Sequence, residues 1–376
     1  MSFELTPITA QEMRAAAAGV KPLPIEQSRA WDAFEERCGR STFGRYAFSH
    51  EGKTLALVSL AEHEIRGVKF LWAKKGPVWL RAQSPAHEAD LRTALKAEVR
   101  RRDRGTRARD RVAFVRLHAR YSAPDLHDLL NTITYDHTVI IDTCGGNEAD
   151  ILAAMPKDGR RAVRRAMDRM KKAGAKPVDL TGISRADFAP VYEVLRETAE
   201  RNGFSIHPME VYWNMLDALG PEHAHLFGVE HGGAIVAWVL VLVNDGHACQ
   251  YYGAHSHAAR EVLASQYLDF WSAKVMGEEG VTSLDLMGVD SMRCPDLYEL
   301  GINKRRYAER DVEVDGAWDL PVIPALYNAL AIAKRGKTVA TSGKALAQDG
   351  LALARRGADL ARDIGRRPES RSTRTR

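Results

Sequence analysis

Apolar and polar positions in the first third of the chain predict mostly strands. After a helical start, residues 52–80 carry apolar runs separated by turn-forming residues, which predicts an antiparallel meander. Ser84 and Pro85 then open a helix with Leu91, Leu95 and Val99 on one face. Two buried strands are expected at 112–119 and 136–142.

A similar order of elements recurs in the second part of the chain. Helices are predicted at 160–174, 184–202 and 209–220, followed by strands within 224–245 and 247–256, a helix at 262–280 and a strand at 283–288. Turn signals at 230–234 and 243–248 make the strands a hairpin-rich sheet. The order predicts an α+β layer structure that is used twice.

Length and charge narrow this picture. The chain has 376 residues, 45% of them hydrophobic, which is beyond the size at which one core usually keeps growing, so two domains are expected. The 54 Lys and Arg residues against 49 Asp and Glu give a net charge of +5. This mild excess is not that of a polybasic protein, so an anionic partner must be met by local patches.

The four cysteines, Cys38, Cys144, Cys249 and Cys294, form no metal-ligand spacing, and we interpret them as free thiols in a reducing compartment. The first residues lack the pattern of a secretory signal, and no apolar run is long enough to span a bilayer. A cytoplasmic location is therefore expected. Peripheral contact with the inner face of the membrane is left open.

The composition changes from about Pro324. Residues 336–376 are expected to form a basic helical extension, with a disordered tail from about Arg366. A basic amphipathic helix of this kind can contact anionic lipid. The alternative is a C-terminal helix that docks on the first domain.

Several enzyme classes lose support because their motifs are missing from the sequence. It contains no GxxxxGK[ST] phosphate loop, no GxGxxG after a strand, no HExxH and no GxSxG. Kinases, dehydrogenases, zinc proteases and α/β-hydrolases are therefore disfavoured.

The remaining signatures matter through their order. They are LPIEQSRAWDAF (23–34), WAKKGPVWL (72–80), HTVIID (137–142), the basic helix RRAVRRAMDRMKKAGA (160–175), LRETAERNGF (195–204), YYGAHS (251–256), SLDLMGV (283–289) and ELGINKRRYAE (299–309). In this order the chain resembles the FemABX family of non-ribosomal peptidyltransferases, which build the interpeptide bridges of peptidoglycan.

The resemblance implies an α+β fold of two tandem GNAT-like domains without a coiled-coil arm. The first would cover residues 1–144, completed by about 316–335, and the second residues 145–315. It also implies that an amino acid moves from aminoacyl-tRNA to the stem-peptide amine of a lipid-linked or UDP-linked muropeptide. Aminoacyl-tRNA would be a co-substrate, and neither a metal nor an organic cofactor is expected.

The family's Phe-Lys signature falls on Lys304, which we expect to stabilise the oxyanion of the tetrahedral intermediate. Asn303 and Ala308 depart from the pattern, where Phe and Gly are usual. These departures bear on the shape of the substrate channel more than on the charge of the lysine. Arg305 and Arg306, which follow directly, are candidates for tRNA binding.

Tyr212 and Tyr252 fall where relatives hold the precursor, although each is also typical of a half-buried core aromatic. His207 lies in the region where some relatives have a phosphate-binding arginine. Arg37 is a candidate diphosphate contact, with a solvent-exposed role as the alternative. His118 is not assigned as a base, because a single strand histidine is usually structural.

The basic helix at 160–174 has two faces. Val163, Ala166, Met167 and Met170 form an apolar stripe that predicts a scaffold helix. Arg161, Arg165 and Arg169 lie on another face, where they either follow tRNA phosphates or are simply solvated.

Two other functions stay open at this level. A GNAT-type N-acyltransferase would use acyl-CoA, but residues 256–268 lack the glycine-rich turn that holds the CoA pyrophosphate. A catalytically silent adaptor for tRNA or a membrane is the third interpretation, and the altered lysine signature is its main support.

Overall fold

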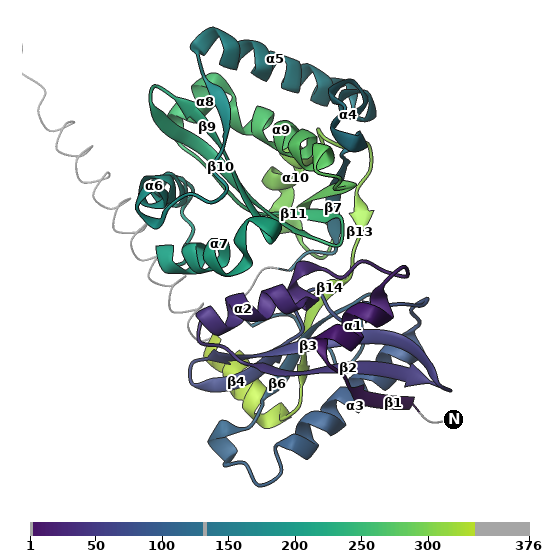
Figure 1. Ribbon diagram of the computed structural model, residues 1–376. Helices are drawn as coiled ribbons and strands as arrows, with labels where there is room; N and C mark the ends of the chain where they lie inside the picture. Colours follow the sequence, from purple (N-terminus) through teal and green to yellow (C-terminus); the bar gives the residue numbers. More distant parts are fainter. Residues whose placement is uncertain (1–2, 131–133, 335–376) are drawn as a thin grey trace, which may run out of the picture. The chain divides into compact units, whose positions relative to one another are not determined.

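The computed structural model describes residues 3–130 and 134–334. The described residues up to Val322 form one compact unit, and those from Ile323 on belong to a second. The first unit contains two β-sheets, each covered by helices (Figure 1). In the second unit, residues 324–334 are helical. The predicted basic extension at 336–376 lies outside the described residues.

The first sheet has the strand order β1-β2-β3-β4-β6-β14, and β5 also pairs with β3. Its strands are β1 Phe3–Pro7, β2 Thr42–His50, β3 Lys53–Ile65, β4 Val68–Trp72, β5 Val78–Trp79, β6 Phe114–Ala119 and β14 Gly316–Pro321. Its helices are α1 Ala10–Ala17, η1 Ile25–Gln27, α2 Arg29–Arg37, α3 Pro85–Arg102 and η2 Ala108–Asp110. The meander predicted at 52–80 is confirmed, whereas β1 and β2 precede it within the region expected to be a helical start.

The second sheet has the order β13-β7-β12-β11-β10-β9-β8. Its strands are β7 His137–Asp142, β8 Lys176–Asp179, β9 Ala224–His231, β10 Ala234–Asn244, β11 His247–His255, β12 Ser283–Gly288 and β13 Val312–Glu313. Its helices are η3 Cys144–Gly146, α4 Glu148–Ala154, α5 Lys157–Ala173, α6 Arg185–Asn202, α7 Met209–His223, α8 His257–Val262, α9 Ala264–Glu278, η4 Pro295–Leu297 and α10 Tyr298–Lys304.

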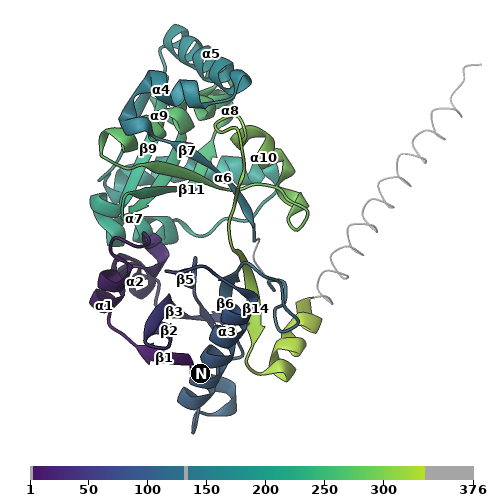
Figure 2. The same ribbon diagram turned by 90° about the vertical axis from the view of Figure 1, so that its right-hand side faces the viewer.

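The two sheets share one construction. In each, two central strands run parallel, β4 with β6 and β11 with β12, and the other described pairs in both sheets are antiparallel. A helical crossover joins each parallel pair: α3 in the first sheet, α8 and α9 in the second (Figure 2). Parallel neighbours need such a crossover because a tight turn can only reverse the chain. The predicted α+β layers, used twice, are confirmed.

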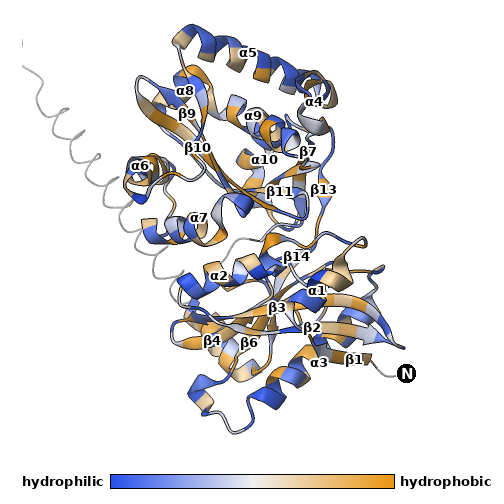
Figure 3. Cartoon of the chain, in the orientation of Figure 1, coloured by the Kyte–Doolittle hydropathy of each residue, from blue (hydrophilic) through white to orange (hydrophobic). Residues whose placement is uncertain are grey.

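Strand β10 divides the second domain into two cores. Val239 and Val241 pack into a cluster with residues of α5 and α9, whereas Trp238 and Leu240 pack into another with residues of α6 and α7. This alternation follows from the two-residue period of a strand. Because both faces are covered, β10 is apolar almost throughout, and it is drawn mainly in orange while α5 is mainly blue (Figure 3).

Helix ends and stripes follow the sequence signals. Ser84 caps α3 by accepting a hydrogen bond from the backbone of His87, and Leu91, Leu95 and Val99 are buried as predicted. In α5, Val163 and Met170 are buried, and the helix ends at Gly174 with φ 69°. The scaffold role of α5 is confirmed.

The sheets place the division between the domains earlier than residue 144. Strand β7 would belong to the first domain by that boundary, but it pairs with β12 and β13 in the second sheet. Its apolar side chains, such as Val139 and Ile141, are buried in the second core. An apolar strand does not reveal which sheet it joins, so the sequence boundary was wrong for this strand. Strand β14 pairs with β6 of the first sheet.

Candidate functional site

The two parallel strands of the second sheet separate after a short pairing. His247–Cys249 of β11 pair with Ser283–Asp285 of β12, and no further partners join them, although β11 continues to His255 and β12 to Gly288. The inner edges of the two strands are therefore not paired with each other beyond Cys249 and Asp285. Such a gap at the carboxyl ends of parallel strands is a common place for a substrate group in α/β proteins.

Lys304, the last residue of α10, reaches this separation. Its Nζ donates to the carbonyl oxygen of Gly288 at 2.9 Å and to that of Met287 at 3.2 Å. Burial lowers the pKa of Lys304, and Asp285 and Asp269 partly oppose this effect. The lysine is therefore a fixed hydrogen-bond donor at the end of β12.

Asp269 of α9 and Lys304 attract each other electrostatically. Its Oδ1 accepts a hydrogen bond from Gln250 Nε2 at 3.1 Å. Burial raises the pKa of Asp269 to about 6, although Gln250, Tyr307 and Lys304 favour the ionised form. A carboxyl group with this pKa changes its protonation state between mildly acidic and neutral pH.

A second lysine approaches β12 from the first domain. Lys75, in the turn after β4, donates a hydrogen bond to the Tyr135 hydroxyl, and its Nζ lies 4.7 Å from the centre of that ring. The Tyr135 ring lies against Gly288, where an added Cβ would come within 2.5 Å of the ring. Gly288 thus connects the two lysines: its carbonyl binds Lys304 and its Cα supports the partner of Lys75.

The neighbouring Lys74 sits among aromatic rings. Its Nζ is 4.8 Å from the ring of Tyr251, 5.0 Å from that of Trp31 and 5.2 Å from that of Trp72. Burial lowers its pKa, against the attraction of Glu26 and Glu35. The rings stabilise the ammonium by cation–π attraction but offer it no hydrogen-bond acceptor.

Gln27 fixes the turn that carries both lysines. Its amide donates to Lys74 O at 2.8 Å and to Ser59 O at 3.3 Å, and its Oε1 accepts from Ser59 N at 2.8 Å. Gly76 passes close to this side chain, since an added Cβ would lie 2.6 Å from Gln27. This contact gives a structural reason for Gln27 and Gly76 in the motifs LPIEQSRAWDAF and WAKKGPVWL.

His118 of β6 adjoins the same turn. Its backbone nitrogen donates to Gly76 O at 2.7 Å, and its Nδ1 lies 2.8 Å from Asp315 O. Burial, with the nearby Lys75, lowers the pKa of His118 to about 3. The imidazole is therefore neutral at pH 7, and Nδ1 carries the proton that the carbonyl accepts.

The two predicted tyrosines lie together. The rings of Tyr212, on α7, and Tyr252, on β11, meet edge to face with centroids 4.8 Å apart. Tyr212 is 2% exposed, and its hydroxyl accepts from the backbone nitrogen of His207 at 3.2 Å. Tyr252 is half-buried. His207 therefore contacts Tyr212 through its backbone nitrogen, and its ring lies 6.2 Å from the Tyr212 ring, centroid to centroid.

Arg37 and Arg305 already have acidic partners. Arg37, at the end of α2, pairs with Asp217 of α7 at 2.8 Å. Arg305 binds Asp290 at 2.6 Å and Asp311 at 2.8 Å. Arg306 is half-buried, and its carbonyl packs on Gly159 of α5. Arg305 thus holds two acidic segments together, a role that the sequence alone did not indicate.

The basic face of α5 is open to solvent. Arg161, Arg165 and Arg169 are exposed, as predicted for that face. Arg161 lies 3.7 Å from Asp158, and Arg169 donates to Glu261 O at 2.7 Å. Arg165 contacts no described residue by a hydrogen bond or ion pair.

Lys74, Lys75 and Tyr135 were missed as site residues. The two lysines stand inside the segment WAKKGPVWL, which was recognised only as one motif in the ordered series. The adjacent lysines directly before the Gly-Pro turn were the signal that could have identified them as site residues. Tyr135 offered none, because its partner lies 60 positions away.

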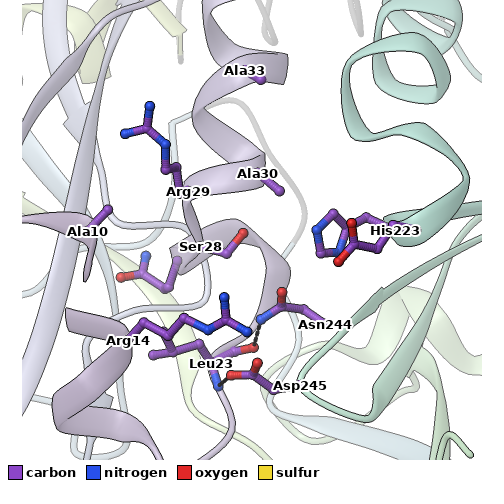
Figure 4. Close-up of a pocket in the computed structure, with 12 residues that line it drawn as sticks. Ala10, Arg14, Leu23, Ser28, Arg29, Ala30, Ala33, His223, Asn244 and Asp245 are labelled. Carbon is purple, nitrogen blue, oxygen red and sulfur yellow. Dashed lines mark hydrogen bonds between the residues drawn. The ribbon is translucent and has the colours of Figure 1, made fainter. Parts of the chain in front are cut away.

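A separate cavity of about 370 Å³ lies between α1, α2 and the hairpin of β10 and β11 (Figure 4). Asn244 and Asp245 form part of its floor, where Asn244 Nδ2 donates to Leu23 O at 2.8 Å and Asp245 Oδ2 accepts from Leu23 N at 3.0 Å. Its lining also includes two basic residues, Arg14 and Arg29, and two acidic ones, Glu222 and Asp245. Gln27 also lines it, so one buried side chain separates this cavity from the lysine turn.

Residues 3–130 and 134–334 contain no group of three or more His, Cys, Asp or Glu side chains placed to hold a metal ion. Within the same ranges, no helix combines the length and the apolar character needed to cross a membrane.

Comparison with known proteins identifies the fold. Residues 157–293 match the model of the acetyltransferase (GNAT) domain. The crystal structure of FemX superposes with a TM-score of 0.64 and 16% sequence identity, over 87% of this chain and 100% of FemX. A tandem GNAT protein from the clavulanic acid biosynthesis pathway superposes with a TM-score of 0.49 and 13% identity, over 85% of this chain and 99% of that protein. No curated protein matches the sequence.

These results confirm the predicted fold of two tandem GNAT-like domains and support the resemblance to the FemABX family. The similarity to FemX extends over both domains, whereas the GNAT domain model covers the second one. The site at β11 and β12 lies within or next to the matched segment, with Lys304 beyond its end.

Proposed function

We propose that this protein is an aminoacyltransferase that moves an amino acid from aminoacyl-tRNA to the stem-peptide amine of a peptidoglycan precursor. The observation that carries the proposal is the position of Lys304, whose ammonium is fixed at the separation of β11 and β12 in a FemX-like fold. Aminoacyl-tRNA serves as co-substrate, and the reaction uses no metal or organic cofactor.

The chemistry requires a donor for developing negative charge. The acceptor amine attacks the ester carbonyl carbon, and the carbonyl oxygen becomes an oxyanion in the tetrahedral intermediate. Collapse breaks the ester bond, and the ribose hydroxyl of tRNA leaves with a proton while the new amide forms. The Lys304 ammonium stabilises the oxyanion best when it is held rigidly and away from water. Its two carbonyl contacts provide that rigidity.

The aromatic pair provides a surface for the precursor. Tyr252 is half-buried beside the fixed Tyr212, and a phenol can donate to a phosphate or a sugar without burying another charge. Arg37 lies on the neighbouring helix α2, where Asp217 already balances its charge in an exposed ion pair. We therefore assign precursor binding first to the tyrosines and second to Arg37. The acceptor is a lipid-linked or UDP-linked muropeptide.

The open face of α5 is the proposed tRNA contact. Arg161 and Arg165 are exposed, and neither is committed to a buried carboxylate. Arg305 contributes less, because Asp290 and Asp311 neutralise it.

An acyl-CoA-dependent N-acyltransferase is the second candidate, and the match to the acetyltransferase domain favours it. Enzymes of that kind hold the CoA pyrophosphate on backbone nitrogens of a glycine-rich turn at a helix start. In this chain the helices after β11 begin with Ser256 and Leu263 as caps, and no glycine lies between Gly253 and Gly277. This segment is poorly suited to a pyrophosphate, so we place acyl-CoA second.

The two candidate functions differ in their acyl donor, aminoacyl-tRNA or acyl-CoA, so a transfer assay distinguishes them. Purified protein is incubated with a charged tRNA pool and UDP-linked or lipid-linked precursor, and in parallel with acetyl-CoA and the same acceptors. Mass spectrometry of the acceptor then reports each transfer. Aminoacylation that needs charged tRNA supports the first proposal. Acetylation from acetyl-CoA in the absence of any tRNA-dependent product would reject it in favour of the second.

A further inference from the structure

Three lysines at the site have no acidic partner within ion-pair distance. Lys74, Lys75 and Lys304 are half-buried, yet none forms an ion pair with a carboxylate among the described residues. Lys304 donates to carbonyl groups, Lys75 donates to a neutral phenol, and Lys74 contacts only aromatic rings. Four other lysines, in contrast, pair with Glu or Asp: Lys69, Lys96, Lys176 and Lys274.

An arrangement of this kind opposes folding unless something compensates it. Removing an ammonium from water is costly, and a buried cation without a counter-ion is the case in which that cost is not recovered. Burial is the largest effect on Lys74 and Lys304 and lowers the pKa of each. Burial also disfavours the Lys75 ammonium, but there the attraction of Tyr135 and Asp285 outweighs it and raises the pKa, so Lys75 stays charged. Asp285 is occupied by other donors, since Thr138 Oγ1 and Met287 N both bond to its Oδ1.

The turn is also built to hold its lysines in place. Gln27 is 1% exposed; its amide nitrogen donates to Lys74 O and Ser59 O, and its amide oxygen accepts from Ser59 N. His118 holds the carbonyl of Gly76 at 2.7 Å. A lysine that served only solubility would not need a rigid turn, whereas rigid donors lose less entropy when they bind a ligand.

We propose that Lys74 and Lys75 form an anion-binding site beside Lys304, which takes a carboxylate or phosphate group of the acceptor substrate. The first domain supplies this site, and the second domain supplies Lys304. Tyr135, the partner of Lys75, packs on Gly288, and the carbonyl of Gly288 binds Lys304, so this site adjoins the lysine of the proposed reaction. The binding of an anion stands by itself, whereas its assignment to the acceptor rests on the proposed function.

Anion-dependent thermal stability tests the site without any reaction. The probes are sodium diphosphate, a lysine-containing pentapeptide with a free C-terminal carboxylate, and the same pentapeptide as its C-terminal amide. At least one of the two anionic probes should raise the Tm of the wild-type protein, more at low than at high salt. A shift with diphosphate identifies phosphate as the source, and a shift with the acid but not the amide identifies a carboxylate.

Lys75 variants test whether the turn with Lys74 and Lys75 is what binds the anion. Lys75→Gln keeps a polar partner for Tyr135 without the charge, and it should weaken binding of the effective anion about tenfold or more, since bonds to charged groups exceed neutral ones. Lys75→Arg should retain most of the binding. Lys69→Gln, on the preceding strand β4, removes a surface lysine paired with Glu62 and should leave binding unchanged.

The outcomes are distinct from those of the transfer assay. Equal anion affinity in Lys75→Gln and wild type, or no Tm shift with any anion, would overturn the site even if the protein transfers amino acids. An anion response that depends on Lys75 would support the site even if no transfer is found. If Lys75→Gln fails to fold, Lys74→Gln in the same titrations gives the decision.

Discussion

Arg116 and Asp319 form a buried ion pair that joins β6 to β14. Arg116 Nε donates to Asp319 Oδ1 at 2.7 Å, the second nitrogen donates to Oδ2 at 3.1 Å, and neither residue is exposed. The two residues are 203 positions apart. The contact fastens the returning strand to the first sheet after the chain has built the second domain.

Loss of this carboxylate should destabilise the protein strongly. Asp319→Ala leaves the Arg116 guanidinium buried without its bidentate partner, and we expect the free energy of unfolding to fall by about 3–5 kcal/mol. Urea unfolding measures this change. Glu313→Gln breaks the exposed pair with Arg120 and should cost less than about 1 kcal/mol. Equal losses in the two variants would refute the special role of the buried pair.

Lys304→Ala should lower turnover more than precursor affinity. The variant removes the donor proposed for the oxyanion, so we expect kcat to fall about 10²–10³-fold with little change in KM for the precursor. Asn303→Ala, one residue earlier and exposed, is the matched control and should keep most activity. Steady-state kinetics with charged tRNA give both constants, and an unchanged kcat in Lys304→Ala would remove Lys304 from the mechanism.

The pH profile adds a second test of Lys304. Its pKa in the folded protein is lowered by burial, so the ammonium is present below that pKa and is lost as pH rises through it. The rate should therefore decline on the alkaline side, at a lower pH than expected for an exposed lysine. Lys304→Arg should retain part of the activity and move this decline to higher pH, because arginine remains charged.

Charge reversal on α5 should weaken tRNA binding if this face follows the phosphate backbone. For Arg161→Glu/Arg165→Glu we expect weaker affinity and a smaller dependence of log Kd on log salt. Arg185→Glu, on an exposed face of α6, changes the charge by the same amount per site and serves as the control. Filter binding across a salt series measures both quantities. Identical binding by wild type and the α5 variant would show that the face is only solvated.

Asp269 should make stability depend on pH between about 4 and 7. Its folded-state pKa of about 6 lies above the ordinary value of 3.8, so the native state favours the protonated form. This contribution is fully present below the unfolded-state pKa and is lost as pH rises through about 6. Asp269→Asn removes the titration and should gain stability relative to wild type as pH rises. Urea midpoints at pH 4, 5, 6 and 7 measure the trend, and a constant difference would contradict it.

Local patterns were sufficient for many of the individual elements. The stripe of α5, the cap of α3 and the meander at 52–80 were predicted because each depends on residues that are close in sequence. The order of the motifs predicted the tandem fold, because it reflects the order of these elements along the chain. Lys304 was placed at the site through the family resemblance.

Only the tertiary structure decided which elements share a sheet and which side chains meet. The β7 strand has the same apolar character whichever sheet it joins, and pairing with β12 assigned it to the second domain. Lys75, Tyr135 and Gly288 have no common local pattern, because they come from a turn in the first domain, the segment between domains and the end of β12. The sequence by itself therefore determined most of the helices and central strands and their order, but not strands such as β1 and β2. The long-range packing of the two sheets determined how Lys74, Lys75 and Lys304 are placed. The sequence could not show this, because contacts between distant residues leave no periodic signal.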